Sequence, residues 1–142
     1  MPKSPLPPDV LEFLRAANPC VIASNRPDGQ PVSVATWYLL EDDGRILVNM
    51  DRRRRRLSYL EADPRVSLTI LAKDWYIHVS VQGRMTDLGT DPELSGIDRL
   101  SIHYTGHPYA VRDKERVNGW VVVDSWHGWR KGTAKLSGPC FW

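Results

Sequence analysis

The sequence predicts one mainly β domain with short peripheral helices, arranged as a small barrel of about six mostly antiparallel strands. Its 142 residues fall within the roughly 100–200 residues typical of one domain. Short apolar or alternating runs rich in β-branched and aromatic residues recur along the chain, with only short helical patterns between them. No GxGxxG motif follows a strand, so a Rossmann dinucleotide site is not supported.

The N-terminal part is predicted to form a short helix followed by three strands. Asp9 can cap the helix, which should end near Asn18-Pro19. The strands are predicted at 20–24, 32–40 and 45–50. The segments RPDG and EDDG between them have the Asp-Gly chemistry of tight turns, which predicts a meander of two hairpins.

The remaining elements are predicted as a helix over 52–62, strands over 65–72 and 75–88, a second helix from Asp91-Pro92 to about His103, and a strand over 116–124. The segment after His127 is rich in Gly and Lys and yields no clear prediction. We therefore expect a single domain over 1–142 with its core at about 8–130.

The predicted strand 75–88 has two chemically different faces. Ile77, Val79 and Val81 alternate with polar or amphipathic residues and should face the core. The other face needs water, a ligand or a partner subunit to cover it, and it carries Tyr76, His78, Ser80 and Gln82.

Composition excludes several classes of protein. Apolar residues make up 42% and charged residues 25%, which is ordinary for a globular chain and disfavours disorder, fibres and coiled coils. No apolar run reaches the roughly 18 residues of a membrane span, and the start MPKSPLPPDV lacks the apolar region of a secretory signal. We therefore expect a cytoplasmic protein with no membrane partner.

Positive charge is concentrated in one run. The formal net charge is +2, and Arg52 to Arg56 alone supply five positive charges, so the rest of the chain is net negative. A nucleic-acid binder more often spreads its basic residues over a face, whereas one focus of charge suits one anionic ligand.

The position of this run favours an anion-binding site. A strand is predicted to end at Met50, Asp51 can cap the following helix, and the arginines occupy the turn and the first helical residues. Free backbone N–H groups, the positive end of the helix dipole and guanidinium forks all attract phosphate. A charge run is often only a solvated helix face, but a place directly after a strand end favours the anion site.

Other candidate chemistries have little support. His103 and His107 have helical metal-ligand spacing, but Gly106 interrupts the helix, and no metal site is expected. Cys20 and Cys140 form no CxxC pair, and we expect both to be reduced and structural. No nucleophile-elbow motif is present. The six tryptophans suit either a core or a pocket for a flat ligand.

Two long stretches of the chain are characteristic: GQPVSVATWYLLEDDGRILVNMDRRRRRLSYLEADPRVSLTIL and WYIHVSVQGRMTDL. Together they resemble the pyridoxamine-phosphate-oxidase-like split β-barrel superfamily. Within it, IDRLSIHYTGHPY and RVNGWVVVDSWHGW resemble the actinobacterial deazaflavin-dependent oxidoreductases, which use coenzyme F420 in place of FMN. The resemblance covers roughly residues 8–130. It implies a six-stranded FMN-binding-type split barrel and a homodimer with two interfacial sites, each built from both chains.

The resemblance also implies which residues bind the cofactor. The family's phosphate-binding Arg-x-Lys pair falls on Arg54 and Arg56, where arginine replaces lysine and keeps the charge. Asn49 and Met50 match the strand end whose backbone lies along the ring system, and Trp37 matches a position facing the pocket.

Further positions match the part of the site that comes from the partner chain. These are Trp75, Tyr76 and His78. No residue matches a universal acid or base, because the hydride chemistry belongs to the cofactor.

Four functions are compatible with these observations. The first is an oxidoreductase that binds reduced coenzyme F420 and transfers hydride to an electron-poor small molecule. The others are an FMN-binding enzyme of the same fold, a non-catalytic carrier or regulator, and, with the weakest support, an RNA binder. Five arginines exceed what one FMN phosphate can use, whereas Arg52, Arg53 and Arg55 could bind the glutamate tail of F420.

Overall fold

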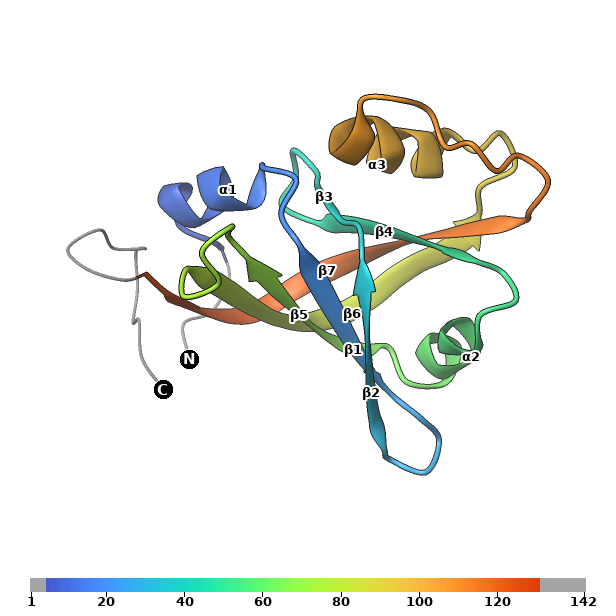
Figure 1. The fold of residues 1–142 in the computed structure, drawn as a ribbon. Helices are drawn as coiled ribbons and strands as arrows, with labels where there is room; N and C mark the ends of the chain where they lie inside the picture. The colour runs from blue at the N-terminus through green and yellow to red at the C-terminus, as the bar shows by residue number, and fades with distance from the viewer. Residues whose placement is uncertain (1–4, 131–142) are drawn as a thin grey trace.

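The computed structural model describes residues 5–130 and contains one curved antiparallel sheet. Its order is β2-β1-β5-β6-β7-β4-β3 (Figure 1). The mainly β prediction is confirmed, with seven strands rather than six. The strands are β1 (Cys20–Asn25), β2 (Pro31–Thr36), β3 (Leu39–Leu40), β4 (Ile46–Asp51), β5 (Arg65–Leu71), β6 (His78–Thr90) and β7 (Arg116–Trp129).

The two edges of the sheet are joined by only two residues. β2 pairs with β1 and β3 pairs with β4, so these strands occupy opposite edges, and Trp37 and Tyr38 link them. The sheet therefore curls into a barrel that stays open between β2 and β3. Both predicted hairpins exist, but the single strand predicted over 32–40 is wrong, and no meander forms.

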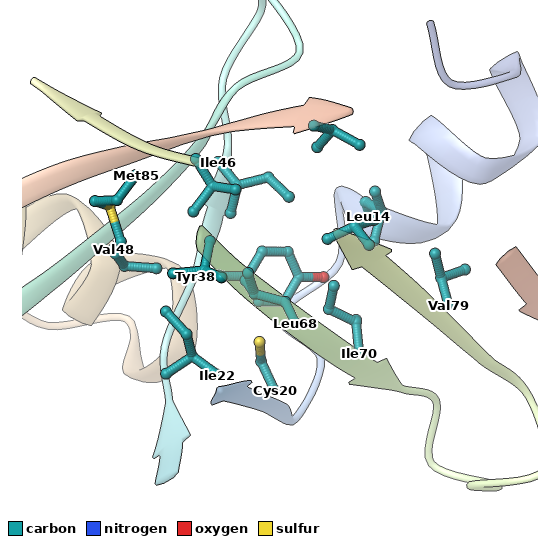
Figure 2. Close-up of a cluster of buried hydrophobic side chains, with 14 of the residues drawn as sticks. Leu14, Cys20, Ile22, Tyr38, Ile46, Val48, Leu68, Ile70, Val79 and Met85 are labelled. Atoms are coloured by element: carbon teal, nitrogen blue, oxygen red, sulfur yellow. The ribbon is translucent and has the colours of Figure 1, made fainter. Parts of the chain in front are cut away.

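Tyr38 explains the break in that predicted strand. Its side chain is fully buried, and its hydroxyl donates to the Ala16 carbonyl at 3.0 Å and accepts from Asn18 Nδ2 at 3.1 Å. In Figure 2 the ring lies in the barrel interior among buried aliphatic and sulfur-containing side chains. Burying such a side chain stabilises the fold by roughly 1.5–3 kcal/mol, which favours turning Tyr38 inward over continuing the strand.

Three helices lie outside the barrel (Figure 1): α1 (Pro8–Leu14), α2 (Arg55–Ala62) and α3 (Ser95–Thr105). Asp9 does not cap α1, because Pro8 already occupies the first helical position and Asp9 lies within the first turn. α1 also ends at Leu14, several residues before the predicted end. None of the helices in residues 5–130 is long and apolar enough to cross a membrane.

α2 begins three residues later than predicted. Asp51 does not cap it, because its Oδ1 accepts from the Arg53 backbone N–H at 2.9 Å in a local turn. Arg54 occupies the N-cap position instead, and no side chain caps the helix. Arg52 to Arg54 therefore form the turn, and only Arg55 and Arg56 belong to the helix.

The long strands β6 and β7 also differ from their predicted bounds. β6 starts at His78, so Trp75 and Tyr76 precede it in a turn, while Val79 and Val81 are fully buried as predicted. β7 extends five residues beyond its predicted end because its register with β6 continues as far as Trp129. Residues 131–142, with Cys140 and Trp142, lie outside the described residues.

Candidate functional site

A cleft of about 860 Å³ lies along β2 and is lined by residues from β4, α2 and α3. In Figure 1, α3 lies above β4 and α2 lies below it. The structure brings six of the predicted site residues to this cleft: Trp37, Asn49, Met50, Arg54, Arg55 and Arg56. The cleft is also lined by residues of α3 and of the segment after it, which were not predicted from the sequence as site residues.

The start of α2 presents free donors at the cleft. The Arg54 backbone N–H donates to the Asp51 carbonyl at 3.0 Å, and the Leu57 N–H donates to the Arg54 carbonyl at 3.1 Å. The N–H groups of Arg55 and Arg56 occupy the first helical positions, which have no intrahelical acceptor. This end of α2 therefore combines free N–H groups, a positive helix dipole and three guanidinium groups.

The cleft collects arginines that have no acidic partner. Among residues 5–130, Arg54, Arg55, Arg56 and Arg116 form no ion pair, and all four line the cleft. Nine other arginines of the described residues form ion pairs with carboxylates, as Arg84 does with Asp124 at 3.2 Å. Unmatched positive charges facing one cavity raise the local concentration of anions there.

The arginine run is divided by its own acidic neighbours. Arg52 lies 3.7 Å from a Glu115 carboxylate oxygen, and Arg53 lies 3.0 Å from one of Asp51. The Arg53 guanidinium and its backbone N–H hold the pKa of Asp51 down at about 2. Neither Arg52 nor Arg53 lines the cleft, so three arginines of the run face it, not five.

Arg56 carries the clearest unsatisfied donor. Its Nε is buried and has no hydrogen-bond acceptor within residues 5–130. Burial, with the neighbouring charges of Arg54 and Arg116, lowers the pKa of Arg56, although an arginine remains protonated. A buried donor without a partner costs roughly 1–3 kcal/mol, so a ligand acceptor would be favoured at this position.

Asn49 is committed to contacts inside the protein. Its side chain is 6% exposed, donates Nδ2 to Asp91 Oδ2 at 3.2 Å and to Asn118 Oδ1 at 2.7 Å, and accepts from Arg116 Nε at 2.7 Å. The Met50 side chain is likewise buried in the core. The side chains of both residues at the β4 end are therefore engaged within the protein.

Asp91 fixes α3 against this strand end. Helix α3 starts at Ser95, later than predicted, yet the Asp91 carboxylate still caps it by accepting from the Gly96 N–H at 3.0 Å and the Ile97 N–H at 2.9 Å. A Cβ on Gly96 would lie 2.0 Å from Asn118 Oδ1, so a larger residue here would displace the Asn118 side chain that bonds Asn49. α3 is thereby held close to the cleft.

An aromatic cluster forms another wall of the cleft. Trp37 stacks on Tyr104 with ring centroids 5.4 Å apart, and its ring meets Tyr109 edge-on at 6.2 Å. The Arg116 guanidinium lies 5.0 Å from the Tyr109 ring centroid. Trp37 was predicted to face the pocket, whereas Tyr104, Tyr109 and Arg116 were not singled out as site residues.

The sequence held one signal for these three residues. They lie within the segments IDRLSIHYTGHPY and RVNGWVVVDSWHGW, which carried the resemblance to the deazaflavin branch. Periodicity could not have selected Tyr109, because it lies in a loop, nor Arg116, which is the first residue of its strand.

The remaining predicted residues lie away from the cleft of their own chain. Trp75 and Tyr76 are 63% and 51% exposed, and their rings stack with centroids 4.5 Å apart. His78 Nδ1 lies 3.2 Å from the Trp75 carbonyl oxygen, which ties the start of β6 to this turn. A single chain therefore does not bring these three residues to the site.

Cys20 also lines the cleft, but burial favours the neutral form of its thiol. It is a free thiol with 3% exposure, and burial raises its pKa to about 12. A thiol of that pKa is almost entirely neutral at pH 7, and the thiolate is the nucleophile. Within residues 5–130 no group of three His, Cys, Asp or Glu side chains is arranged to hold a metal ion.

Sequence comparison identifies the protein family to which this fold and cleft belong. Residues 6–130 match the family described as pyridoxamine 5'-phosphate oxidase, and the chain belongs to that family. Oxidoreductase chemistry is the general class of function that this family supports. No curated protein matches the chain.

Solved structures share the fold. An F420 reductase superposes with a TM-score of 0.72 at 24% identity, covering 81% of this chain and 93% of its own. A conserved hypothetical protein from Mycobacterium tuberculosis gives 0.73 at 24% identity, with 96% and 94% covered. A putative pyridoxamine 5'-phosphate oxidase from Listeria innocua gives 0.65 at 15% identity, with 84% and 94% covered. The split-barrel prediction is confirmed.

Proposed function

We propose that this protein is an oxidoreductase that binds coenzyme F420 in the cleft and passes hydride from the reduced cofactor to an electron-poor small molecule. The observation that carries the proposal is the set of four cleft arginines without an ion pair. An anionic cofactor would satisfy the three of these charges at the start of α2, Arg54, Arg55 and Arg56. The structural likeness to an F420 reductase adds support for a deazaflavin over other anionic ligands.

The residues present fit such a cofactor. Arg54, Arg56 and the free N–H groups of α2 would bind its phosphate, which gives the buried Arg56 Nε an acceptor. Arg55 would meet the glutamate tail, and the ring system would lie along the backbone of Asn49 and Met50. When bound, the deazaflavin supplies the hydride from its C5 position.

The chain's own contribution is orientation and charge. The rigid β4 end and the aromatic wall would align the ring and exclude water, which lowers the barrier by fixing the reacting partners in place. The arginines would stabilise negative charge close to the site. No side chain is assigned as acid or base, because the hydride chemistry belongs to the cofactor.

We infer that the working unit is a homodimer in which Trp75, Tyr76 and His78 complete the cleft of the second copy. The stacked Trp75–Tyr76 pair and the 36%-exposed Trp129 are large apolar groups on the surface of a single chain. Trp129 pairs in register with His78, so these groups belong to neighbouring parts of one surface. Aromatic residues of this kind are enriched at protein interfaces.

FMN remains a second candidate because of one specific observation. Arg52 and Arg53 are held by Glu115 and Asp51 outside the cleft, so the excess of arginines over one phosphate is smaller than the sequence suggests. Three cleft arginines of the run could serve one FMN phosphate. The two cofactors are distinguished by which one the protein binds and oxidises.

The proposal is tested by mixing the protein with reduced F420 and a panel of quinones, tetrapyrroles and unsaturated lactones. The rate of cofactor oxidation is measured from the recovery of the absorbance of the oxidised cofactor. We expect this rate to exceed the rate without protein for at least one acceptor. F420 binding without turnover of any acceptor would indicate a carrier. Turnover with reduced FMN alone would establish the second candidate.

A further inference from the structure

Arg116 is separated in sequence from the other cleft arginines and is held differently. It is the first residue of β7, and its Nε donates to Asn49 Oδ1 at 2.7 Å. Asn49 is in turn fixed by Asp91 and Asn118. The Tyr109 ring lies 5.0 Å from the guanidinium carbon. The guanidinium of Arg116 is therefore positioned before any ligand arrives.

The two terminal nitrogens of Arg116 remain available for a ligand. The structure gives them no hydrogen bond to any of residues 5–130, and the side chain is half-buried at the cleft. Asp51 lines the same cleft, but its carboxylate is bonded to the Arg53 side chain at 3.0 and 3.2 Å. A planar fork with free donors matches a carboxylate, which it can bind bidentately.

The surroundings of this fork suit a flat molecule. Trp37, Tyr104 and Tyr109 line the cleft with it, and Trp37 and Tyr104 are already stacked. The phosphate of the proposed cofactor has donors of its own at the start of α2. Arg116, in contrast, contacts the aromatic cluster directly.

We propose that Arg116 binds the carboxylate of a planar acceptor substrate and so makes the enzyme select anionic over neutral acceptors. This inference rests on the proposed function, since it assigns the substrate class of the same cleft. A carboxylate of the cofactor tail is the alternative ligand of the Arg116 guanidinium. The experiment distinguishes the substrate carboxylate from the tail carboxylate.

The test measures binding of 2-naphthoate and of its neutral analogue 2-naphthamide by calorimetry, in the presence and absence of saturating F420. The variants are Arg116→Gln, which removes the charge, and Arg116→Lys, which keeps the charge but loses the fork. Arg84→Gln is the matched control, because Arg84 pairs with Asp124 and does not line the cleft. Thermal melting checks that each variant is folded.

We expect the wild-type protein, with F420 bound, to bind naphthoate more tightly than naphthamide. Arg116→Gln should weaken naphthoate binding about tenfold or more, and this loss should be larger than the loss in Arg116→Lys. The affinities of Arg116→Gln for naphthamide and for F420 should stay within about twofold of the wild type. The control should behave as wild type.

Three results would overturn the inference: no preference for naphthoate in the wild type, no loss in Arg116→Gln, or an equal loss of F420 affinity, which would assign Arg116 to the cofactor tail. If F420 does not bind the wild type, the proposed function fails. The naphthoate comparison on the cofactor-free protein still decides the role of Arg116.

Discussion

The buried carboxylate of Asp91 joins the end of β4 to the first turn of α3 through Asn49. Asp91 is 3% exposed, its Oδ2 accepts from Asn49 Nδ2 at 3.2 Å, and both of its oxygens accept backbone N–H groups of α3. The side-chain oxygen of the same Asn49 accepts a hydrogen bond from Arg116 Nε. One buried group thus supports the helix, the strand end and a cleft arginine together.

We expect Asp91→Asn to destabilise the fold by roughly 1.5–3 kcal/mol, because an amide nitrogen would face donors that now meet a carboxylate. Urea unfolding followed by tryptophan fluorescence measures the change. Asp124→Asn is the control, since Asp124 is half-exposed and its partner Arg84 lies at the surface. Equal midpoints for both variants would show that Asp91 does not support the site.

The protein should be a dimer at micromolar concentration by size-exclusion chromatography with light scattering. Replacing both Trp75 and Tyr76 by Ser should raise the monomer fraction, because it removes the exposed aromatic pair. Ile102→Ser is the control, since Ile102 is 50% exposed on α3 and is not assigned to the interface. A monomeric wild type would contradict the two-chain site.

Arg55 should contribute to F420 affinity in proportion to the length of the glutamate tail. Its side chain is exposed at the cleft, so Arg55→Ala should cost only about twofold to fivefold, with a smaller loss at high salt. Replacing Arg52 and Arg53 by Ala should have less effect, because both are paired outside the cleft. Losses that do not depend on glutamate number would remove the tail assignment.

The Cys20 thiol should resist modification in the folded protein. Because burial raises its pKa to about 12, the neutral thiol persists through pH 8, and a disulfide reagent should react only after unfolding in urea. The measurement is made on Cys140→Ser, which leaves Cys20 as the one thiol. Rapid labelling of the folded variant would show that the cleft wall opens at Cys20.

The parts of the fold that could be predicted are those set by local chemistry. The RPDG and EDDG turns form where the sequence places them, with Gly29 and Gly44 at φ values of 86° and 89°. The start of α2 was displaced because Asp51 could either cap the helix or form a local turn, and Arg53 decided in favour of the turn. Sequence pattern gives no measure of that competition.

Long-range packing decided the features that could not be predicted. Tyr38 breaks the strand because it is buried in a core cluster with residues distant in sequence, such as Leu68 and Ile70. The Arg116 side chain is held at the site by a hydrogen bond to Asn49, which lies 67 positions earlier in the chain. The ion pair of Arg52 depends on Glu115, which lies 63 positions later in the chain. Such pairings are properties of the folded sheet.

The central claim, that the arginine-lined cleft binds an anionic deazaflavin, is tested most directly by titrating F420 and FMN into the wild type and into Arg54→Ala/Arg56→Ala. The control is Arg65→Ala/Arg84→Ala, which removes two arginines that already have carboxylate partners. We expect F420 to bind more tightly than FMN, and the cleft variant to lose on the order of a hundredfold or more in affinity while the control binds as wild type. Equal affinity of the cleft variant and the wild type would contradict the account.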